Sequence, residues 1–426
     1  MLFSKSLIDR WSKNQKLLLT FGVLLAIAAF CMGLVMRTLE PQNGLYWMPD
    51  FDDYYSGGYH ILHGLHLYDA KAGPLNLLFN YQPFAALLFV PFALLNMRIS
   101  EIIWTIFNVL ALFAVLWMTF DMMHFSSGRH RLLLTTIATI GCTLLDSVLS
   151  NLIFGQICVI LMLLVFIDVQ PWMPRRWCGI ATGIAATIKL TPLIFIVYLF
   201  LIGRRRGAIQ AAAVFIATFL VGLLLLPAET NRYWFSLGFL DLSRIVTATD
   251  VQHSLFGFFA RLTGNAITPS LWAIPVCAAV AIYGLIFAII STKKGHNLLG
   301  ILTVGFTAAL VSPVSWSYDY VWIAPALIWL VLATWRSRIT LPRILFPIII
   351  LWSIVPFYWS GNRVGQTPAY QVTLQGNLIA TIGSPMTMIF LAFATLPIWL
   401  PKLLPPDQTL LSNSKTNIND LNVIAR

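Results

Sequence analysis

The chain carries little charge for its length. Of 426 residues only 10% are charged, with 16 acidic and 27 basic side chains, whereas 58% are hydrophobic. Soluble domains carry about 25% charged residues, so the composition excludes an ordinary soluble enzyme. Apolar runs of roughly 17–25 residues, the length that crosses a hydrocarbon core of about 30 Å, recur along the sequence. We therefore predict an all-α polytopic membrane protein.

Two further absences narrow the function. The five cysteines lie in or beside apolar runs without metal-ligand spacing, which predicts inert buried thiols rather than a metal site or a disulfide framework. The sequence shows no glycine-rich phosphate loop and nothing typical of a soluble nucleotide-sugar domain, so no cofactor is expected. The net charge of +11 comes mostly from basic residues beside apolar runs, and it does not indicate a nucleic-acid partner.

The basic residues predict the topology. About twelve segments are expected to span the membrane: 17–36, 82–97, 101–120, 132–150, 154–170, 178–203, 208–227, 270–291, 296–312, 318–335, 343–359 and 378–400. The positive-inside rule places the following basic clusters in the cytoplasm: 5–16, 204–206, 293–294, 336–343 and 402. Both termini are then cytoplasmic, in a multi-pass protein of the cytoplasmic membrane. The outward segments are 37–80, 228–269, 313–317 and 360–377.

The chain is predicted to form one membrane domain over residues 1–400. Its first apolar run follows Lys5, Arg10, Lys13 and Lys16 and is long for a signal peptide, so we expect an uncleaved signal-anchor. The polar tail 401–426 is rich in asparagine and serine, which predicts a disordered cytoplasmic segment.

One section allows two topologies. If 82–97 and 101–120 both span, Arg129 and Arg131 fall outside, against the positive-inside rule. The alternative makes 82–120 a single net crossing and folds 176–203 into a hairpin broken at Thr191-Pro192. Both schemes leave Asp50 on the outer side.

The outward segment 37–80 concentrates acidic residues. Only two basic residues, Arg37 and Lys71, offset its five acids, which are Glu40, Asp50, Asp52, Asp53 and Asp69. Carboxylates beside a bilayer indicate a proton acceptor or a cation site, although solvated loop charge is the commoner meaning of such a cluster. The amphipathic run 59–65 predicts a short interfacial helix that holds Asp52 and Asp53 near the bilayer surface.

Three histidines in this segment are a minority candidate for a metal site. His60, His63 and His66 recur at a spacing that brings imidazoles near one helical face. The spacing drifts around the helix and Gly64 interrupts it, so no metal is predicted.

The later outward segments carry candidates for a phosphate-bearing lipid. Arg261 is either a phosphate ligand or a snorkelling anchor beside the apolar stretch that precedes it. In the polar turn 312–320, Pro313 breaks a helix. Asp319 is an unusual charge at the end of a span, and its structural explanation would be a helix cap or a buried ion pair.

Two charges inside the spans are costly. Asp146 and Lys189 either pair with each other, or Lys189 reaches a lipid phosphate from a helix broken at Pro192. Gln156 at a helix start is more typical of a helix–helix hydrogen bond than of a ligand contact.

An ordered set of motifs resembles a known family. Asp50, Tyr54, Gly64 and Tyr68 stand at the spacing D-x3-Y-x9-G-x3-Y. The later motifs are Tyr81-Gln82-Pro83, Phe154-Gly155-Gln156, Lys189-Leu190-Thr191-Pro192 before Arg204-Arg205-Arg206, Ser254-Leu255 with Arg261, and Ser312-Pro313-Val314-Ser315-Trp316. Over residues 15–335 this order resembles glycosyltransferase family 87, GT-C-type enzymes that include polyprenyl-phosphate-mannose-dependent α-mannosyltransferases.

The resemblance implies a fold, a reaction and partners. It implies a GT-C-type bundle of about 12 transmembrane helices with a long first outward loop carrying short interfacial helices. It implies inverting transfer of a hexose, mannose above all, from a polyprenyl-phosphate donor to a glycolipid or glycan acceptor at the outer face of the membrane. The partners are therefore the donor lipid, the acceptor and the bilayer.

The resemblance also assigns residues. Asp50 matches the catalytic base, with Asp52 or Asp53 orienting the acceptor or replacing Asp50 as base. The candidates for acceptor binding are Asp52, Asp53, Tyr54, Tyr68 and Trp316, and those for donor phosphate are Lys189, His253 and Arg261. Two departures stand out, because Gln252-His253-Ser254 replaces an Asn-Gln-Ser and Tyr318-Asp319 replaces a histidine pair. His253 is the candidate substitute for the missing histidine.

Two other classes of function remain. A lipid or solute transporter predicts charges near the bilayer midplane in discontinuous helices and internal repeats. Only Asp146, Lys189, Gly155-Gln156 and the break at Pro192 suit it, and no repeat at half-length is evident. A non-catalytic scaffold is a third possibility, but the polar and aromatic outward segments disfavour it.

Overall fold

A computed structural model describes residues 48–69, 71–72, 77–125, 128–170, 172–236, 238, 252–263 and 273–336. The predicted spans 17–36, 343–359 and 378–400 and the tail 401–426 lie outside these residues. The described part is almost entirely helical, as its apolar composition predicts, because backbone groups in a bilayer must be satisfied within the segment.

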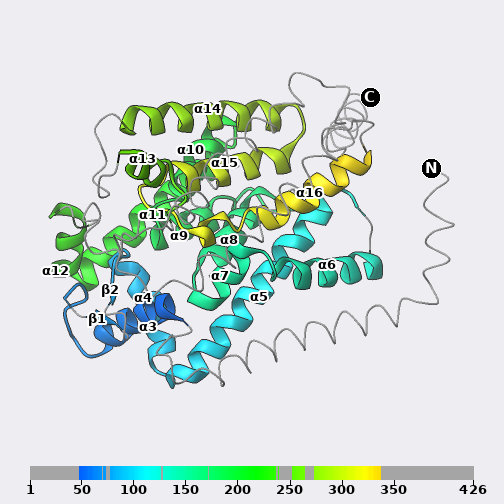
Figure 1. The fold of residues 1–426 in the computed structure, drawn as a ribbon. Coiled ribbons are helices and arrows are strands. Elements are labelled where there is room, and N and C mark those ends of the chain that lie inside the picture. The colour runs from blue at the N-terminus through cyan, green and yellow to red at the C-terminus, as the bar shows by residue number, and fades with distance from the viewer. Residues whose placement is uncertain are drawn as a thin grey trace, which may run out of the picture.

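The helices and their order along the chain are shown in Figure 1. In chain order they are α3 (Pro49–Leu62), α4 (Pro83–Ala93), α5 (Met97–Met122), α6 (Gly128–Cys142), α7 (Asp146–Phe154), α8 (Cys158–Val169), α9 (Ile180–Ile188), α10 (Leu193–Leu201), α11 (Arg205–Leu225), α12 (Pro227–Thr230), α13 (Leu255–Thr263), α14 (Ala273–Lys293), α15 (Asn297–Val311) and α16 (Ile323–Arg336). A π-helix covers Asn231–Phe235 and a 3-10 helix covers Ser317–Tyr320. One small antiparallel hairpin pairs β1 (Lys71–Ala72) with β2 (Leu77–Leu78).

Fewer helices than expected are long enough to span a membrane alone. Each of the nine predicted spans between residues 82 and 335 coincides with a helix or helix pair. In the described residues, only α5, α11 and α14, of 26, 21 and 21 residues, are both long and apolar enough to cross. A fourth candidate is the pair α6–α7, which bends by 76° at its break. The count of about 12 spanning helices therefore stays a prediction.

Helices α9 and α10 form a hairpin against α11. A Cβ added to Gly179 would lie 1.9 Å from the carbonyl oxygen of Gly207, and the hydroxyls of Thr187 and Thr218 are 2.7 Å apart. The earlier residue of α9 meets the earlier residue of α11, and the later meets the later, so the two helices run parallel. Only three residues separate the end of α10 from the start of α11, so α10 runs antiparallel to α11. The hairpin agrees with the second of the two predicted topologies.

The same scheme suits α4 and α5. With 11 residues, α4 is about 16 Å long, too short to cross a core of about 30 Å. In the scheme with a single net crossing by α4 and α5, Arg129 and Arg131 are predicted to be cytoplasmic. Arg131 pairs with Asp121 at the end of α5.

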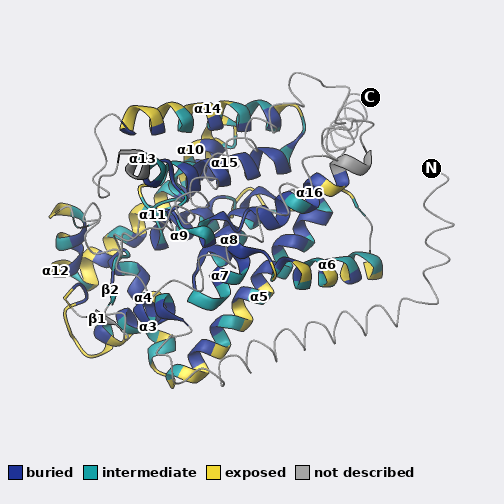
Figure 2. Ribbon diagram, in the orientation of Figure 1, coloured by how far each residue is buried: buried dark blue, intermediate teal, exposed yellow. Residues whose placement is uncertain are grey.

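The hydrophobic core centres on α8, α15 and α16. Figure 2 shows α15 buried along most of its length, whereas α14 exposes one flank. Helices α14 and α15 approach closely at Gly284, where an added Cβ would lie 2.1 Å from the Thr307 hydroxyl. Small residues at helix contacts are typical of membrane bundles.

A second apolar cluster forms around α3 and α4, beside the β-hairpin and α12 (Figure 1). Pro49 at the first helical position and acids in the first turn favour the start of α3. Gly58 lets this helix touch the backbone of α4, since an added Cβ would lie 2.6 Å from Phe89. Gly64, at φ +63°, follows the end of the helix. A helix therefore covers most of the run 59–65, but it begins ten residues earlier than expected, and its place at the membrane surface stays a prediction.

Candidate active site

Helix α3 points its carboxylates at different neighbours. Asp50 is half-buried, whereas Asp52 and Asp53 are buried. The charges that act on Asp50 include Lys189 and Asp319, and those that act on Asp52 are Glu101 and Arg98 of α5. The three acids that the sequence places together thus divide between two environments.

The environment of Asp50 suits a proton acceptor. Burial raises its pKa from 3.8 to about 7, against a hydrogen bond from the Gln156 side chain and the positive charge of Lys189, which both lower it. The charges of Asp319 and Asp52 raise it further. A carboxyl whose pKa lies near the operating pH is well suited to general acid–base work.

Gln156 lies on the turn between α7 and α8, held from three sides. Its backbone N–H donates to Asn151 at 2.8 Å, and the carbonyl of Gly155 accepts from the Trp104 indole at 2.7 Å. Gly155 has φ +71° and lies against Phe51, whose Cβ would be 2.6 Å from an added Cβ. The turn therefore presents Gln156 directly to α3.

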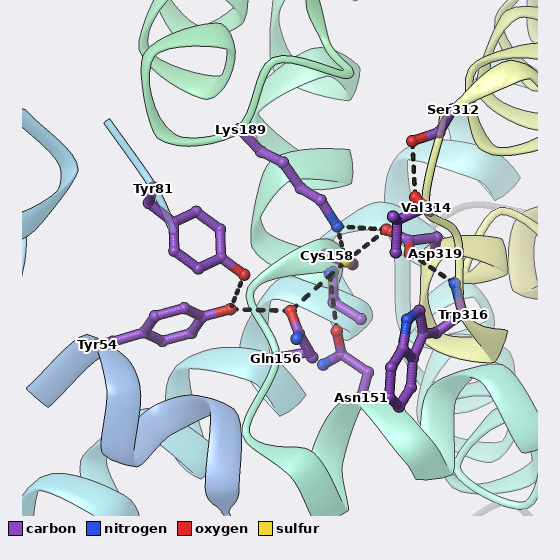
Figure 3. Close-up of polar contacts among 11 residues, drawn as sticks. Tyr54, Tyr81, Asn151, Gln156, Cys158, Lys189, Ser312, Val314, Trp316 and Asp319 are labelled. Carbon is purple, nitrogen blue, oxygen red and sulfur yellow. Dashed lines mark hydrogen bonds and ion pairs between the residues drawn. The ribbon is translucent and has the colours of Figure 1, made fainter. Parts of the chain in front are cut away.

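Two tyrosines complete this group, as Figure 3 shows. The Tyr54 hydroxyl donates to Gln156 Oε1 at 2.8 Å and lies 3.0 Å from the Tyr81 hydroxyl. Burial raises the pKa of both phenols far above neutrality. Both hydroxyls therefore keep their protons.

A partly buried ion pair lies on the other side of Gln156. Lys189 Nζ donates to Asp319 Oδ1 at 2.5 Å, and the Cys158 thiol lies 3.4 Å from the same oxygen and 3.7 Å from Nζ. Asp319 Oδ2 accepts from the backbone N–H of Trp316 at 2.9 Å. Asp319 thus combines both of its expected structural roles, a cap and a buried pair.

The suggested pairing of Asp146 with Lys189 is wrong. Asp146 instead hydrogen-bonds Ser150 on its own helix and Ser317 on the 3-10 helix. Lys189 lies at the tip of the α9–α10 hairpin, where the chain leaves the helix and its side chain reaches the 3-10 helix rather than α7. Two serine side chains therefore satisfy Asp146, and Lys189 pairs with Asp319 instead.

A small cavity opens beside the ion pair. It has a volume of about 40 Å³ and lies between α8, the α9–α10 hairpin, α15 and the start of α16. Lys189 and Asp319 supply its charged lining, and most of the other walls are apolar, among them Phe195 and Trp322.

The structure gives the remaining acceptor candidates structural contacts. Tyr68 is buried and donates to the carbonyl of Tyr81 at 2.7 Å. Trp316 stacks on Tyr318 with ring centroids 5.8 Å apart. Both residues therefore border the group around Asp50.

Of the two remaining candidates for binding the donor phosphate, only His253 has described contacts. The backbone N–H of His253 donates to Ser315 at 2.8 Å, and its carbonyl accepts from the Tyr320 hydroxyl at 2.7 Å. These bonds tie His253 to the polar turn that carries Asp319. Arg261 lies on α13, and its side chain is outside the described residues.

The three histidines do not converge. His63 Nδ1 lies 2.8 Å from the Tyr59 carbonyl, and His66 Nδ1 lies 3.3 Å from Glu229. Among the residues that the structure describes, no group of three metal-ligating side chains occurs.

Sequence reasoning undervalued two residues of the site. Gln156 was expected to join helices, and Tyr81 was noted only as part of a motif. The available signal was position, since each is a polar residue at the start of an apolar helix. Their convergence depends on α3 packing against the α7–α8 turn.

Comparison with known proteins identifies the family. The model for glycosyltransferase family 87 matches residues 79–313. This range includes Tyr81, Gln156 and Lys189, whereas Asp50 precedes it.

Curated relatives agree with this match. A Mycobacterium tuberculosis protein named polyprenol-phosphate-mannose-dependent alpha-(1-2)-phosphatidylinositol mannoside mannosyltransferase is 34% identical over 282 residues, covering 62% of this chain and 64% of that protein. The chain thus matches slightly less than two thirds of that relative's length. Two proteins named as the corresponding pentamannoside mannosyltransferase are similar as well. One, from M. tuberculosis, is 30% identical over 74% of this chain and 73% of its own length. The other, from Mycolicibacterium smegmatis, is 32% identical over 70% of this chain and 74% of its own length. The family resemblance is confirmed: this chain belongs to glycosyltransferase family 87.

Proposed function

We propose that the chain transfers mannose from polyprenyl-phosphate mannose to a glycolipid of the phosphatidylinositol mannoside class. The observation that carries the proposal is the group formed by Asp50, Gln156 and the Lys189–Asp319 pair. It combines a carboxyl whose pKa is raised to about 7 with a partly buried cation. The names of the curated relatives supply the donor and the acceptor class.

The chemistry needs both charges. Asp50 takes the proton from an acceptor hydroxyl while that oxygen forms a bond to the anomeric carbon, and the bond to the donor's phosphate oxygen breaks. The phosphate leaves with the bonding electrons, and Lys189 stabilises its charge. A single base and direct attack invert the anomeric carbon, so a β-linked donor gives an α-mannoside.

Lys189 is suited to the donor phosphate. Its Nζ already donates to Asp319 at 2.5 Å, but an ammonium has three donors, so it can serve a phosphate oxygen as well. The cavity beside the pair gives the phosphate end of a lipid an apolar border. His253 and Arg261 stay predicted as additional donor ligands.

On the acceptor side, the assignments stay predictions. Tyr54 and Tyr68 are buried with their hydroxyls engaged, so we infer that they shape the site. Asp52, Asp53 and Trp316 remain the candidates for direct contact with the acceptor.

The arrangement of the hairpin supports an outward-facing site. Its two ends lie beside the first turn of α11, close to the Arg204–Arg206 cluster that the positive-inside rule places in the cytoplasm. Lys189 follows Thr187, which contacts Thr218, roughly 20 Å further along α11. The catalytic group and the arginines therefore lie toward opposite ends of the same helix, and we infer that Asp50 faces outward.

Reconstituted protein tests the proposal directly. Nanodiscs containing the purified chain are supplied with radiolabelled polyprenyl-phosphate mannose and phosphatidylinositol mannosides, and products are separated and their linkage determined. We expect a mannosylated lipid with an α linkage from the lipid donor, and none from a nucleotide-linked mannose. Asp50→Asn is the inactive variant. Asp69→Asn is its matched control, because Asp69 is half exposed and pairs with Arg232 rather than with the site.

The competing transporter hypothesis has its own outcome in the same system. Movement of labelled lipid across the bilayer by protein that transfers no mannose would replace the enzyme with a flippase. Transfer of another sugar would retain the reaction class and reject mannose.

A further inference from the structure

Gln156 lies between the proposed base and a buried phenol, and one orientation of its amide satisfies both when Asp50 is ionised. Its carbonyl oxygen accepts from the Tyr54 hydroxyl at 2.8 Å. The amide nitrogen is then the group left to bond Asp50, and it is also the only part of a glutamine side chain that can donate to a carboxylate. Tyr54 therefore determines which end of the amide faces the acid.

The surroundings leave Gln156 little freedom to turn. Its side chain is buried, and its backbone is tied to Asn151 while Trp104 holds the preceding carbonyl. The hydroxyl of Tyr81, 3.0 Å from that of Tyr54, extends the same chain of polar groups. Asp50 is thus met by a fixed donor, whereas no glutamine acts on Asp52.

We propose that Gln156 is the positioning residue for Asp50, oriented by Tyr54, and that this contact selects Asp50 rather than Asp52 as the base. The inference rests on the proposed function and deepens it. Gln156 touches neither donor nor acceptor in this assignment. It holds the carboxylate in place and stabilises its ionised form, which is the form that accepts the proton.

The test measures the protonation of Asp50 itself, so it does not depend on transfer. Infrared difference spectra of protein in nanodiscs are recorded across pH, and the carboxylic acid band that Asp50→Asn removes is assigned to Asp50. In Gln156→Met, we expect the midpoint of this band to rise by about 1 pH unit, the size of one lost hydrogen bond to a charged group. Gln170→Met is the matched control, since Gln170 is equally buried but bonds Met122 and Phe166.

A milder variant covers the case in which Gln156→Met does not fold. Tyr54→Phe keeps the glutamine and removes the hydroxyl that orients it, so a smaller rise in the same direction is expected. Tyr198→Phe is its control, because Tyr198 is a buried phenol bonded to Thr292. An unchanged or lowered Asp50 midpoint in folded Gln156→Met, or in Tyr54→Phe alone where the first variant is unfolded, would reject the positioning role.

Transfer assays separate this inference from the function it rests on. If the wild type transfers mannose and Asp50→Asn does not, while Gln156→Met keeps both its midpoint and its rate, only the inference fails. If the wild type transfers nothing, the proposed function fails, and the infrared midpoint still decides whether Gln156 positions Asp50.

Discussion

Asp50 and Asp52 lie two residues apart on the same helix, and burial raises the pKa of each from 3.8 to about 7. Their neighbours differ. Asp50 meets a glutamine amide and the charge of the partly buried Lys189, together with the like charges of Asp319 and Asp52. Asp52 meets the like charge of Glu101 and the exposed Arg98, without an amide among the causes of its shift. A raised pKa alone therefore does not identify a catalytic base.

The difference lies in what each acid can do once ionised. Near Asp50, a fixed amide donor stabilises the carboxylate, and Lys189 provides the positive charge that a departing phosphate requires. Near Asp52, a second carboxylate opposes ionisation, and the arginine side chain is mostly in solvent, where screening weakens it. We infer that the base lies in the first environment, and that Asp52 in the second remains a candidate only for contact with the acceptor.

The largest expected effect comes from removing one carboxylate at a time. Asp50→Asn should lower transfer by roughly 10²–10⁴-fold, because proton transfer to a positioned base contributes about that factor. Asp52→Asn should lower it less than tenfold. Rates are measured in nanodiscs at saturating donor, with protein amounts matched by size-exclusion profiles. Equal losses in the two variants would mean that the surroundings of Asp50 and Asp52 do not determine which of them is the base.

Breaking the ion pair behind Asp50 should affect both stability and transfer. Lys189→Met leaves the partly buried Asp319 without its partner. The cost should lie between the roughly 1 kcal/mol of an exposed pair and the roughly 3–5 kcal/mol of a fully buried one. Adding Asp319→Leu should recover most of that stability without recovering transfer, because the cation is still missing. Thermal unfolding in detergent and transfer assays are recorded on both variants. Recovery of transfer in the double variant would exclude Lys189 as a phosphate ligand.

The pH dependence of transfer sharpens the comparison further. The base acts only when ionised, and the pKa of Asp50 is raised to about 7, so kcat/KM should fall as the pH is lowered through about 7. Asp52→Asn removes a like charge that raises the pKa of Asp50, so the midpoint of this decline should move slightly to lower pH but stay well above 4. A decline near pH 4, where an ordinary carboxyl titrates, would contradict the environment assigned to Asp50.

The smallest effect is expected at the exposed edge of the same region. Arg232 pairs with Asp69 at 2.6 Å, with 42% and 56% of the two side chains exposed. Exposed pairs contribute about 0–1 kcal/mol, so Arg232→Gln should barely shift the unfolding temperature and should change transfer less than threefold. A loss comparable to that of Lys189→Met would mean that the outer loops, rather than the buried pair, hold the site together.

Several features were predictable from local patterns. Each predicted span from 82 to 335 coincides with a helix or helix pair, because long apolar runs in a bilayer leave the backbone no alternative to internal hydrogen bonds. Lys189 was singled out because a charge inside a span is costly, and Asp50 because it begins an ordered motif in an acidic outward segment. The motif order led to the right family, which the family model and the relatives confirm.

Other features were not predictable from local patterns. The expected pairing of Asp146 with Lys189 is wrong because the hairpin directs Lys189 to the 3-10 helix, and sequence separation does not encode that direction. Nor could spacing distinguish Asp50 from Asp52, since both lie in the first turn of one helix.

The order and composition of the residues thus determined the class of protein, most helix positions and the family, because these depend on hydrophobicity and on short motifs. The partners of the buried charges were decided only in three dimensions. Glycines let α3 approach the α7–α8 turn and α9 approach α11, and those contacts bring residues from four distant segments around Asp50. Whether a buried carboxyl becomes a base depends on which of them it meets.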